Sequence, residues 1–281
     1  MRKEKAKMRH PIITIAYANL ESWIHTPRTI IMLIMIVMLC FLEVKRMFAT
    51  LDQMGVTLYW AEMPYKLLEN GVNVFVSSIL FFVMVSELPR QLPYQNLMLI
   101  RSDRRQWLTA QIAYSTWMVL AVLLLLIVCT LIFSIGGAPL QSGWSDNARI
   151  AEGSMLETGA LIPAYIREHF STITAIFYAV LPLLCFWFSM SMIILLCSLL
   201  GSQFIGLIIC AFALLGHFIG SYDFPYPIKF AIVQELNPDI FGPERYRITI
   251  GVYMALNALM ILGMYLRIKH TNLVFSTQNK M

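Results

Sequence analysis

The strongest candidates for a functional role lie in one short segment with both charged and apolar residues. It is SELPRQLPYQNLMLIRSDRRQW, at positions 86–107. Pro89 and Pro93 break any helix that precedes them. The run from Tyr94 to Ile100 is then predicted to form a short apolar helix. A rigid apolar helix held beside a membrane is suited to docking in the groove of a partner protein. The alternative is a solvated basic loop, which explains the arginines of the segment but not its apolar residues.

The surface predicted to dock consists of seven residues of this segment. They are Tyr94, Leu97, Met98, Ile100, Arg101, Arg104 and Arg105. Ser102 or Asp103 can cap the helix that follows, and Trp107 is expected at the depth of lipid headgroups.

Polar side chains inside the apolar stretches form a second group of candidates. His217, in ALLGHFIG, stands out as a titratable group there, and an ionisable group in lipid is a functional candidate. It either makes local hydrogen bonds or contacts a substrate. Gln111, Tyr114 and Ser115 either pack a helix interface or line a pathway. His217, Gln111 and Tyr114 are therefore a candidate substrate path or polar network.

The motifs of several enzyme classes are absent from the sequence. It contains no GxxxxGK[ST] phosphate loop, no HExxH and no GxSxG, and its five histidines do not cluster. The five cysteines lie in apolar stretches without a metal-binding pattern; they are Cys40, Cys129, Cys185, Cys197 and Cys210. We therefore expect no catalytic residue, no metal site, no cofactor bound by this chain, and no ATP hydrolysis by the chain alone.

Composition places the elements that position these residues in a membrane. Of the 281 residues, 58% are hydrophobic and 13% charged, whereas soluble domains have about 25% charged residues. Several apolar stretches approach the roughly 20 residues that a helix needs to cross a bilayer. The net charge is +5, but the basic residues flank apolar stretches, where they act as topology signals. We therefore expect a polytopic, all-α protein of the cell membrane that contacts lipid and binds no nucleic acid.

The chain is predicted to form a single transmembrane domain over residues 1–281. It begins with a basic cytoplasmic tail at 1–10, an amphipathic interfacial helix at 11–26 and then six spans. The spans are expected at about 29–48, 71–86, 107–135, 173–200, 204–220 and 248–266. A cytoplasmic segment at 87–106 joins the second and third spans, and the outer segments are 49–70, 136–172 and the loop 221–247. The third to sixth spans contain no Asp, Glu, Lys or Arg in their apolar interiors, so the energy for any transport must come from elsewhere.

The interfacial helix and the charge bias set the expected orientation. Six apolar residues follow helical spacing and form one face of the helix at 11–26: Ile13, Ala16, Tyr17, Leu20, Trp23 and Ile24. Asn19 is expected to lie away from that face. With the N-terminus inside, the cytoplasmic parts hold 13 basic and four acidic residues, against eight basic and 12 acidic outside. This bias predicts that both termini are cytoplasmic.

This pattern resembles the type-2 permease family of ATP-binding-cassette (ABC) transporters, the ABC-2 or ABCG-like exporters. The likeness is architectural and covers nearly the whole chain. It rests on the interfacial helix at 11–26, six spans, both ends inside, the short helix Tyr94–Ile100 and the outer segment YDFPYPIKFAIVQELNPDIFGPERY. The resemblance implies that Tyr94–Ile100 is a coupling helix within a coupling segment at 87–106. It also implies that the outer segment forms a re-entrant element.

The resemblance further implies a dimer with a second permease subunit, identical or homologous, and two separate cytoplasmic ABC ATPase subunits. ATP and Mg²⁺ would be bound by those ATPases. The expected activity is export of a peptide, drug or lipid-like substrate, including resistance to multiple drugs or antimicrobial peptides. Two alternatives remain at this stage: a non-transporting membrane anchor or sensor subunit, and an intramembrane enzyme.

Overall fold

The computed structural model describes residues 11–55, 57–89, 103–141, 143–145, 164–219 and 238–268. Within these ranges all regular secondary structure is helical, and no strand occurs. The helices are α1 (Pro11–Ile24), α2 (Pro27–Met54), the 3₁₀ helix η1 (Trp60–Glu62), α3 (Met63–Glu69), α4 (Gly71–Val85), α6 (Arg104–Ser134), α8 (Ala164–His169), α9 (Thr172–Leu199), α10 (Gln203–Ile219) and α11 (Pro238–Ile268).

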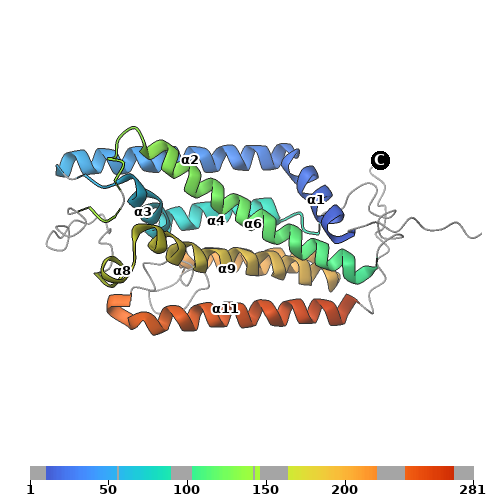
Figure 1. The fold of residues 1–281 in the computed structure, drawn as a ribbon. Coiled ribbons are helices and arrows are strands. Elements are labelled where there is room, and N and C mark those ends of the chain that lie inside the picture. Colours follow the sequence, from blue (N-terminus) through green and yellow to red (C-terminus); the bar gives the residue numbers. More distant parts are fainter. Residues whose placement is uncertain are drawn as a thin grey trace, which may run out of the picture.

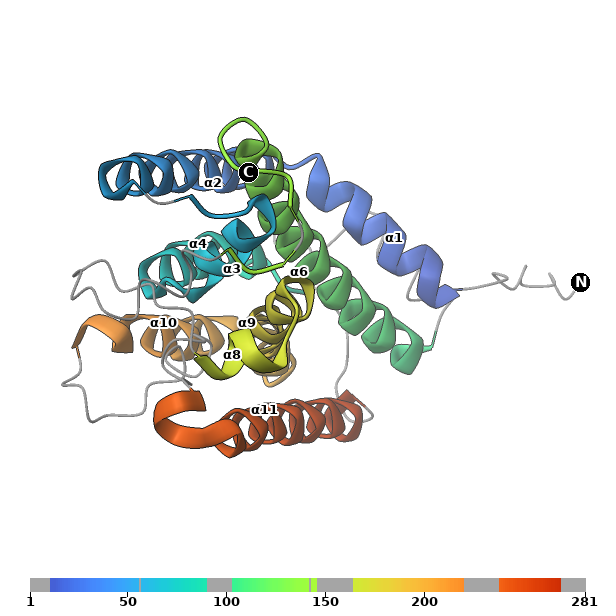
Figure 2. The same ribbon diagram turned by 60° about the vertical axis from the view of Figure 1, so that its left-hand side comes forward.

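The long helices form a bundle with α2 and α11 at opposite edges and α4, α6 and α9 between them (Figure 1). The short helices α3 and α8 lie at one end of this bundle, and α1 lies at the other end (Figure 1). Helix α1 packs along α6, and α10 packs against α9 (Figure 2). The tight turn between α9 and α10 uses Gly201 with φ 101°, a conformation that a residue with a Cβ rarely adopts.

Aromatic side chains hold the centre of the bundle together. The rings of Phe81 on α4 and Trp187 on α9 stack with their centroids 4.5 Å apart. The Trp187 indole N–H donates to Ser78 Oγ at 2.8 Å, so its polar atom is satisfied inside the core. A second cluster surrounds the buried Trp107 and Leu108 at the start of α6 and includes Met264 near the end of α11. Trp107 is therefore packed between helices, and its position at headgroup depth stays a prediction.

Among the described residues, three helices are long and apolar enough to cross a membrane by themselves: α6, α9 and the part of α11 from Pro243 to Ile268. Helix α4 becomes a fourth only together with Trp60–Glu69, from which it is bent by 75°. The part of α10 with described side chains, Gln203–Leu215, is apolar but too short to be counted as a span. In α2 the stretch without charges runs from residue 29 to 42 and is followed by Glu43. These helices fit a multi-pass membrane protein.

The observed helices occupy all six stretches that the sequence predicted as spans, with some different ends. Helix α2 continues past residue 48 to Met54 and stops at Gly55, whose φ of 66° is left-handed. Helix α11 begins at Pro238, inside the predicted outer loop 221–247. The rest of that loop, residues 221–237, lies outside the described residues, as do residues 1–10 and 90–102.

The predicted outer segment 49–70 contains two short helices that pack inside the protein. Residues 60–69 form η1 and α3, and every residue from Ala61 to Glu69 is buried. Helix α3 packs against α4, α6 and α9. Three charged residues of this stretch, Glu62, Lys66 and Glu69, are therefore buried in the protein.

The predicted apolar face of the interfacial helix is divided between protein and surface. Ala16 and Trp23 are buried, whereas Ile13 and Tyr17 are 68% and 64% exposed. Asn19, which we expected away from the apolar face, is 1% exposed. The reason is that α1 packs on α6, so the neighbouring helix rather than hydropathy alone decides which face is buried.

Candidate functional site

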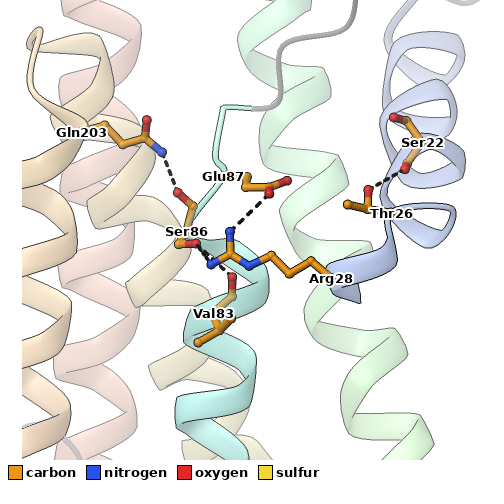
Figure 3. Close-up of polar contacts among 7 residues, drawn as sticks. All are labelled: Ser22, Thr26, Arg28, Val83, Ser86, Glu87 and Gln203. Carbon is orange, nitrogen blue, oxygen red and sulfur yellow. Dashed lines mark hydrogen bonds and ion pairs between the residues drawn. The ribbon is translucent and has the colours of Figure 1, made fainter. Parts of the chain in front are cut away.

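The end of α4 is tied to two other helices just before the segment that was predicted to dock. Arg28, in the first turn of α2, donates from Nη2 to Ser86 Oγ at 2.8 Å and from Nη1 to Glu87 Oε1 at 3.2 Å. Gln203, at the start of α10, donates from Nε2 to the backbone carbonyl of Ser86 at 2.6 Å. Figure 3 shows these contacts at Ser86 and Glu87. We call Arg28, Ser86, Glu87 and Gln203 the inner junction.

Local sequence explains why these groups meet. Pro27 occupies the first turn of α2 and fixes where that helix begins, which places Arg28 at its exposed end. Thr26 Oγ1 donates to the carbonyl of Ser22 at 3.0 Å and closes the end of α1 (Figure 3). Ser86 Oγ also donates to the carbonyl of Val83 at 2.9 Å, at the end of α4. The junction therefore joins the α1–α2 corner, the end of α4 and the start of α10.

The ion pair in this junction positions the helix ends more than it stabilises the fold. The Arg28 and Glu87 side chains are 41% and 43% exposed, and an exposed ion pair contributes only about 0–1 kcal/mol. The junction connects residues 86–87 by hydrogen bonds to both α2 and α10.

The far side of the predicted docking segment is anchored at the start of α6. Asp103 is the N-cap residue, and its backbone N–H donates to Gln106 Oε1 at 3.1 Å, as in a capping box. The prediction that Ser102 or Asp103 caps this helix is thus confirmed for Asp103. Arg104 and Arg105 follow as exposed residues of the first turn.

The other residues predicted to dock are outside the described part of the chain. They are Tyr94, Leu97, Met98, Ile100 and Arg101. The docking helix itself therefore stays a prediction, bounded by the inner junction on one side and the capped start of α6 on the other.

The candidate polar network lies on α6 and α10. Gln111 and Ser115 are 0% exposed and Tyr114 is 2% exposed, so all three are buried among the helices. Ser115 Oγ donates to the backbone carbonyl of Gln111 at 3.0 Å. Neither side-chain amide atom of Gln111 has a hydrogen-bond partner in the described residues. His217 belongs to the last turn of α10, but its side chain is outside the described residues.

Sequence reasoning missed a buried charged cluster on η1 and α3. Glu62, Lys66 and Glu69 are 0%, 8% and 2% exposed, although burying a charge without compensation is costly. Lys66 Nζ donates to Glu69 Oε2 at 3.3 Å. The spacing 62, 66 and 69 places the three side chains on one face of a helix. That spacing was the signal available in the sequence, but it is equally typical of a solvated helix face.

Glu62, the member of this cluster on η1, binds a loop that is distant in the sequence. Ser145 donates to Glu62 twice, from its backbone N–H to Oε1 and from Oγ to Oε2, the second at 3.1 Å. The preceding Trp144 packs edge-on against Tyr65, with ring centroids 5.9 Å apart. The Trp144 indole N–H donates to the carbonyl of Phe170 at 2.8 Å. These contacts, which we call the outer clasp, join α3 to the loop after α6 and to the start of α9.

The described residues offer no group of three or more His, Cys, Asp or Glu side chains that could hold a metal ion. All five cysteines are free thiols, and four of them are buried. Comparison of the chain with protein-family models, curated proteins and solved structures found no match.

Proposed function

We propose that this chain is the membrane-spanning permease subunit of an ABC transporter, of the ABC-2 or ABCG-like type. It would export a peptide, drug or lipid-like substrate, with ATP hydrolysed by separate subunits. The observation that best supports this proposal is the inner junction, where Arg28 and Gln203 bind Ser86 and Glu87 at the start of the predicted coupling segment 87–106. A transporter driven by a separate ATPase needs such a link between its docking segment and its spanning helices.

The proposed mechanism follows from the contacts on both sides of the coupling segment. When an ATPase that is bound to residues 94–100 moves, it displaces the chain at residues 86–87. The hydrogen bonds to Arg28 and Gln203 pass that displacement to α2 and α10. On the other side, the capped first turn of α6, with Asp103, resists fraying. A single cytoplasmic movement thereby shifts several spanning helices together.

The proposed arrangement in the membrane has six spans, built on α2, α4, α6, α9, α10 and α11. Helix α1 lies in the interface, and its exposed Ile13 and Tyr17 face the acyl region. The distribution of basic residues favours cytoplasmic termini. Consistent with this orientation, α1 and the end of α11 lie at the same end of the bundle (Figure 1). Two such subunits, with the transport path between them, would bind two ATPases that carry ATP and Mg²⁺.

A non-transporting anchor or sensor subunit remains the second candidate, because a rigid junction beside a docking segment also suits a passive attachment site. An intramembrane enzyme is a third candidate and would need a catalytic pair inside the bilayer. ATP-driven movement separates the first candidate from the other two.

The decisive experiment is purification of the tagged chain in mild detergent from cells that express it at natural levels. The proposal expects a P-loop ATPase in stoichiometric amount, whose ATP hydrolysis is accompanied by substrate movement in reconstituted vesicles. An ATPase that binds without any transport would favour the anchor. Purification without any P-loop protein would contradict the proposal.

A further inference from the structure

A cavity of about 220 Å³ opens between α2 and the end of α6. These two helices pack directly against each other. The apolar lining consists of Phe41, Val44, Phe48, Phe133, Gly136 and Gly137, and Lys45 adds the single charged side chain. The lining suits a hydrocarbon chain, and the lysine suits an anion. Neither the inner junction nor the outer clasp includes these residues.

Packing of the walls gives this cavity a defined shape. The Phe41 and Phe133 rings meet edge-on, with centroids 5.5 Å apart. Gly137 lets the Phe48 ring approach the backbone: a Cβ at position 137 would lie 2.8 Å from that ring. Any larger residue at 137 must therefore push Phe48 aside. At the neighbouring Gly136, an added Cβ would meet nothing within 4 Å.

The charge at the cavity is not neutralised by the acid nearest to it in sequence. Glu43 Oε2 is occupied by Arg46 at 2.8 Å and by Asn73 at 3.3 Å. Lys45 instead lies with Nζ 5.0 Å from the Phe41 ring centroid, and it forms no ion pair with the described residues. An exposed ammonium group thus stands beside an apolar cavity.

The position along α2 indicates where the ligand comes from. The charge-free stretch of α2 runs from residue 29 to 42, and Lys45 lies just beyond it. In a membrane this is headgroup depth, where a lysine extends its ammonium toward phosphates while its stem stays among acyl chains. From this combination of cavity, aromatic walls and unpaired cation, we propose that the Phe41–Phe133 cavity binds an anionic phospholipid of the surrounding leaflet. The acyl chain fills the cavity and the phosphate group pairs with Lys45.

This proposal can be tested on the purified full chain without a partner, so its outcome is independent of the transport proposal. The probes are phosphatidylglycerol and phosphatidylcholine with identical acyl chains that carry a photoreactive group. Each is titrated into nanodiscs of otherwise uniform phosphatidylcholine, and crosslinked residues are mapped by mass spectrometry. We expect crosslinks in 41–48 and 133–137, with phosphatidylglycerol favoured about fivefold, since one lysine near a membrane surface attracts an anionic lipid to about this extent.

Two variants separate the charge from the cavity. Lys45→Gln should abolish the preference for phosphatidylglycerol, so that both lipids crosslink as much as phosphatidylcholine does to the wild-type chain. Lys45→Arg should retain the preference. Gly137→Ala should reduce crosslinking of both lipids because Phe48 must move. Gly251→Ala on α11 is the matched control, because its added methyl group meets no neighbour and Gly251 does not line the cavity.

Three results would each overturn the proposal. One is equal crosslinking of the two lipids in the wild-type chain, and another is an unchanged preference in Lys45→Gln. The third is crosslinking spread over the exposed faces of α2 and α6 without enrichment at 41–48 and 133–137. Any of them would make the cavity an ordinary part of the lipid-facing surface.

Discussion

Glu62 and Ser145, 83 positions apart in the chain, are joined by two hydrogen bonds in a buried site at the end of the bundle that holds α3. The Glu62 carboxylate accepts from both donors of Ser145, its backbone N–H and its hydroxyl. Both residues are buried, so these two hydrogen bonds satisfy polar groups that water does not reach. The pair therefore fixes the loop after α6 onto η1 and α3.

The first prediction concerns the stability of this outer clasp. Glu62→Ala should destabilise the protein by about 1–3 kcal/mol, because two buried donors of Ser145 lose their acceptor. Ser145→Ala should cost less, about 1 kcal/mol, because the backbone N–H still donates to Glu62. Thermal unfolding in detergent measures both. Glu21→Gln, at an exposed position on α1, is the control and should change stability by less than about 0.5 kcal/mol. Equal stability of Glu62→Ala and Glu21→Gln would show that the clasp contributes nothing.

The second prediction concerns the inner junction and rests on the proposed function. Arg28→Gln removes the guanidinium that contacts Ser86 and Glu87, and Gln203→Ala removes the amide that contacts Ser86. Both contacts involve exposed or half-buried groups, so unfolding should change by only about 0–1 kcal/mol. Binding of the ATPase should persist, but ATP hydrolysis should no longer drive substrate movement. Reconstituted vesicles with transport and phosphate release measured in parallel give the coupling ratio. Arg247→Gln changes an exposed arginine of α11 outside the junction and the predicted docking surface, so it should keep the wild-type ratio. Arg28→Gln would do the same if the junction had no coupling role.

The third prediction addresses docking by the predicted coupling helix. Leu97→Asp should weaken binding of the ATPase more than Leu97→Ala, because a buried unpaired carboxylate adds a desolvation cost. Loss of an apolar anchor typically costs about 1–2 kcal/mol, which is a tenfold change or more in the dissociation constant at the upper end. Arg104→Ala should have a milder effect because Arg104 is exposed. Pull-down through the permease, with ATPase activity measured on the eluate, tests the series. Full recovery of ATPase with Leu97→Asp would leave residues 87–106 as a topological loop.

A fourth prediction concerns orientation in the membrane. Gln141→Cys, at an exposed position beyond the end of α6, should react with a membrane-impermeant maleimide in intact cells. Arg105→Cys, at the opposite end of the same helix, should react only after permeabilisation. The five native cysteines provide a low background because four are buried and Cys197 is half-buried. Labelling of Arg105→Cys from outside would reverse the orientation and exclude cytoplasmic docking at residues 94–100.

The fifth prediction distinguishes packing from transport at Gln111. Gln111→Leu removes two buried polar atoms that lack partners among the described residues, so the variant should be as stable as the wild type or more stable. If Gln111 only packs the helix interface, transport also remains unchanged. A clear loss of stability in thermal unfolding would show that the amide makes contacts with residues outside the described ranges.

Much of the helical architecture could be predicted because it depends on local sequence. Long runs without charges predicted the positions of the six long helices, since a helix satisfies its own backbone hydrogen bonds. The ion pair between Glu43 and Arg46 at 2.8 Å follows from their helical spacing, three residues apart on α2. The cap at Asp103 is likewise a local signal.

The contacts that give the candidate sites their shape could not be predicted in this way. Charged residues such as Glu62 and Lys66 have the same spacing in a solvated helix and in a buried one, so only the packing of α3 against α4, α6 and α9 reveals their burial. The choice of the buried face of α1, with Asn19 inside and Ile13 outside, depends in the same way on the position of α6.

The sequence by itself determined that this is a helical, apolar chain with a basic segment at 87–106, because hydropathy and proline positions act within a few turns of helix. Tertiary structure alone decided that Arg28 meets Glu87, that Gln203 meets Ser86 and that Glu62 meets Ser145. Each of these pairs joins helices or loops that are far apart in the chain. Their partners are selected by how the apolar faces of the bundle pack, and no local pattern records that choice.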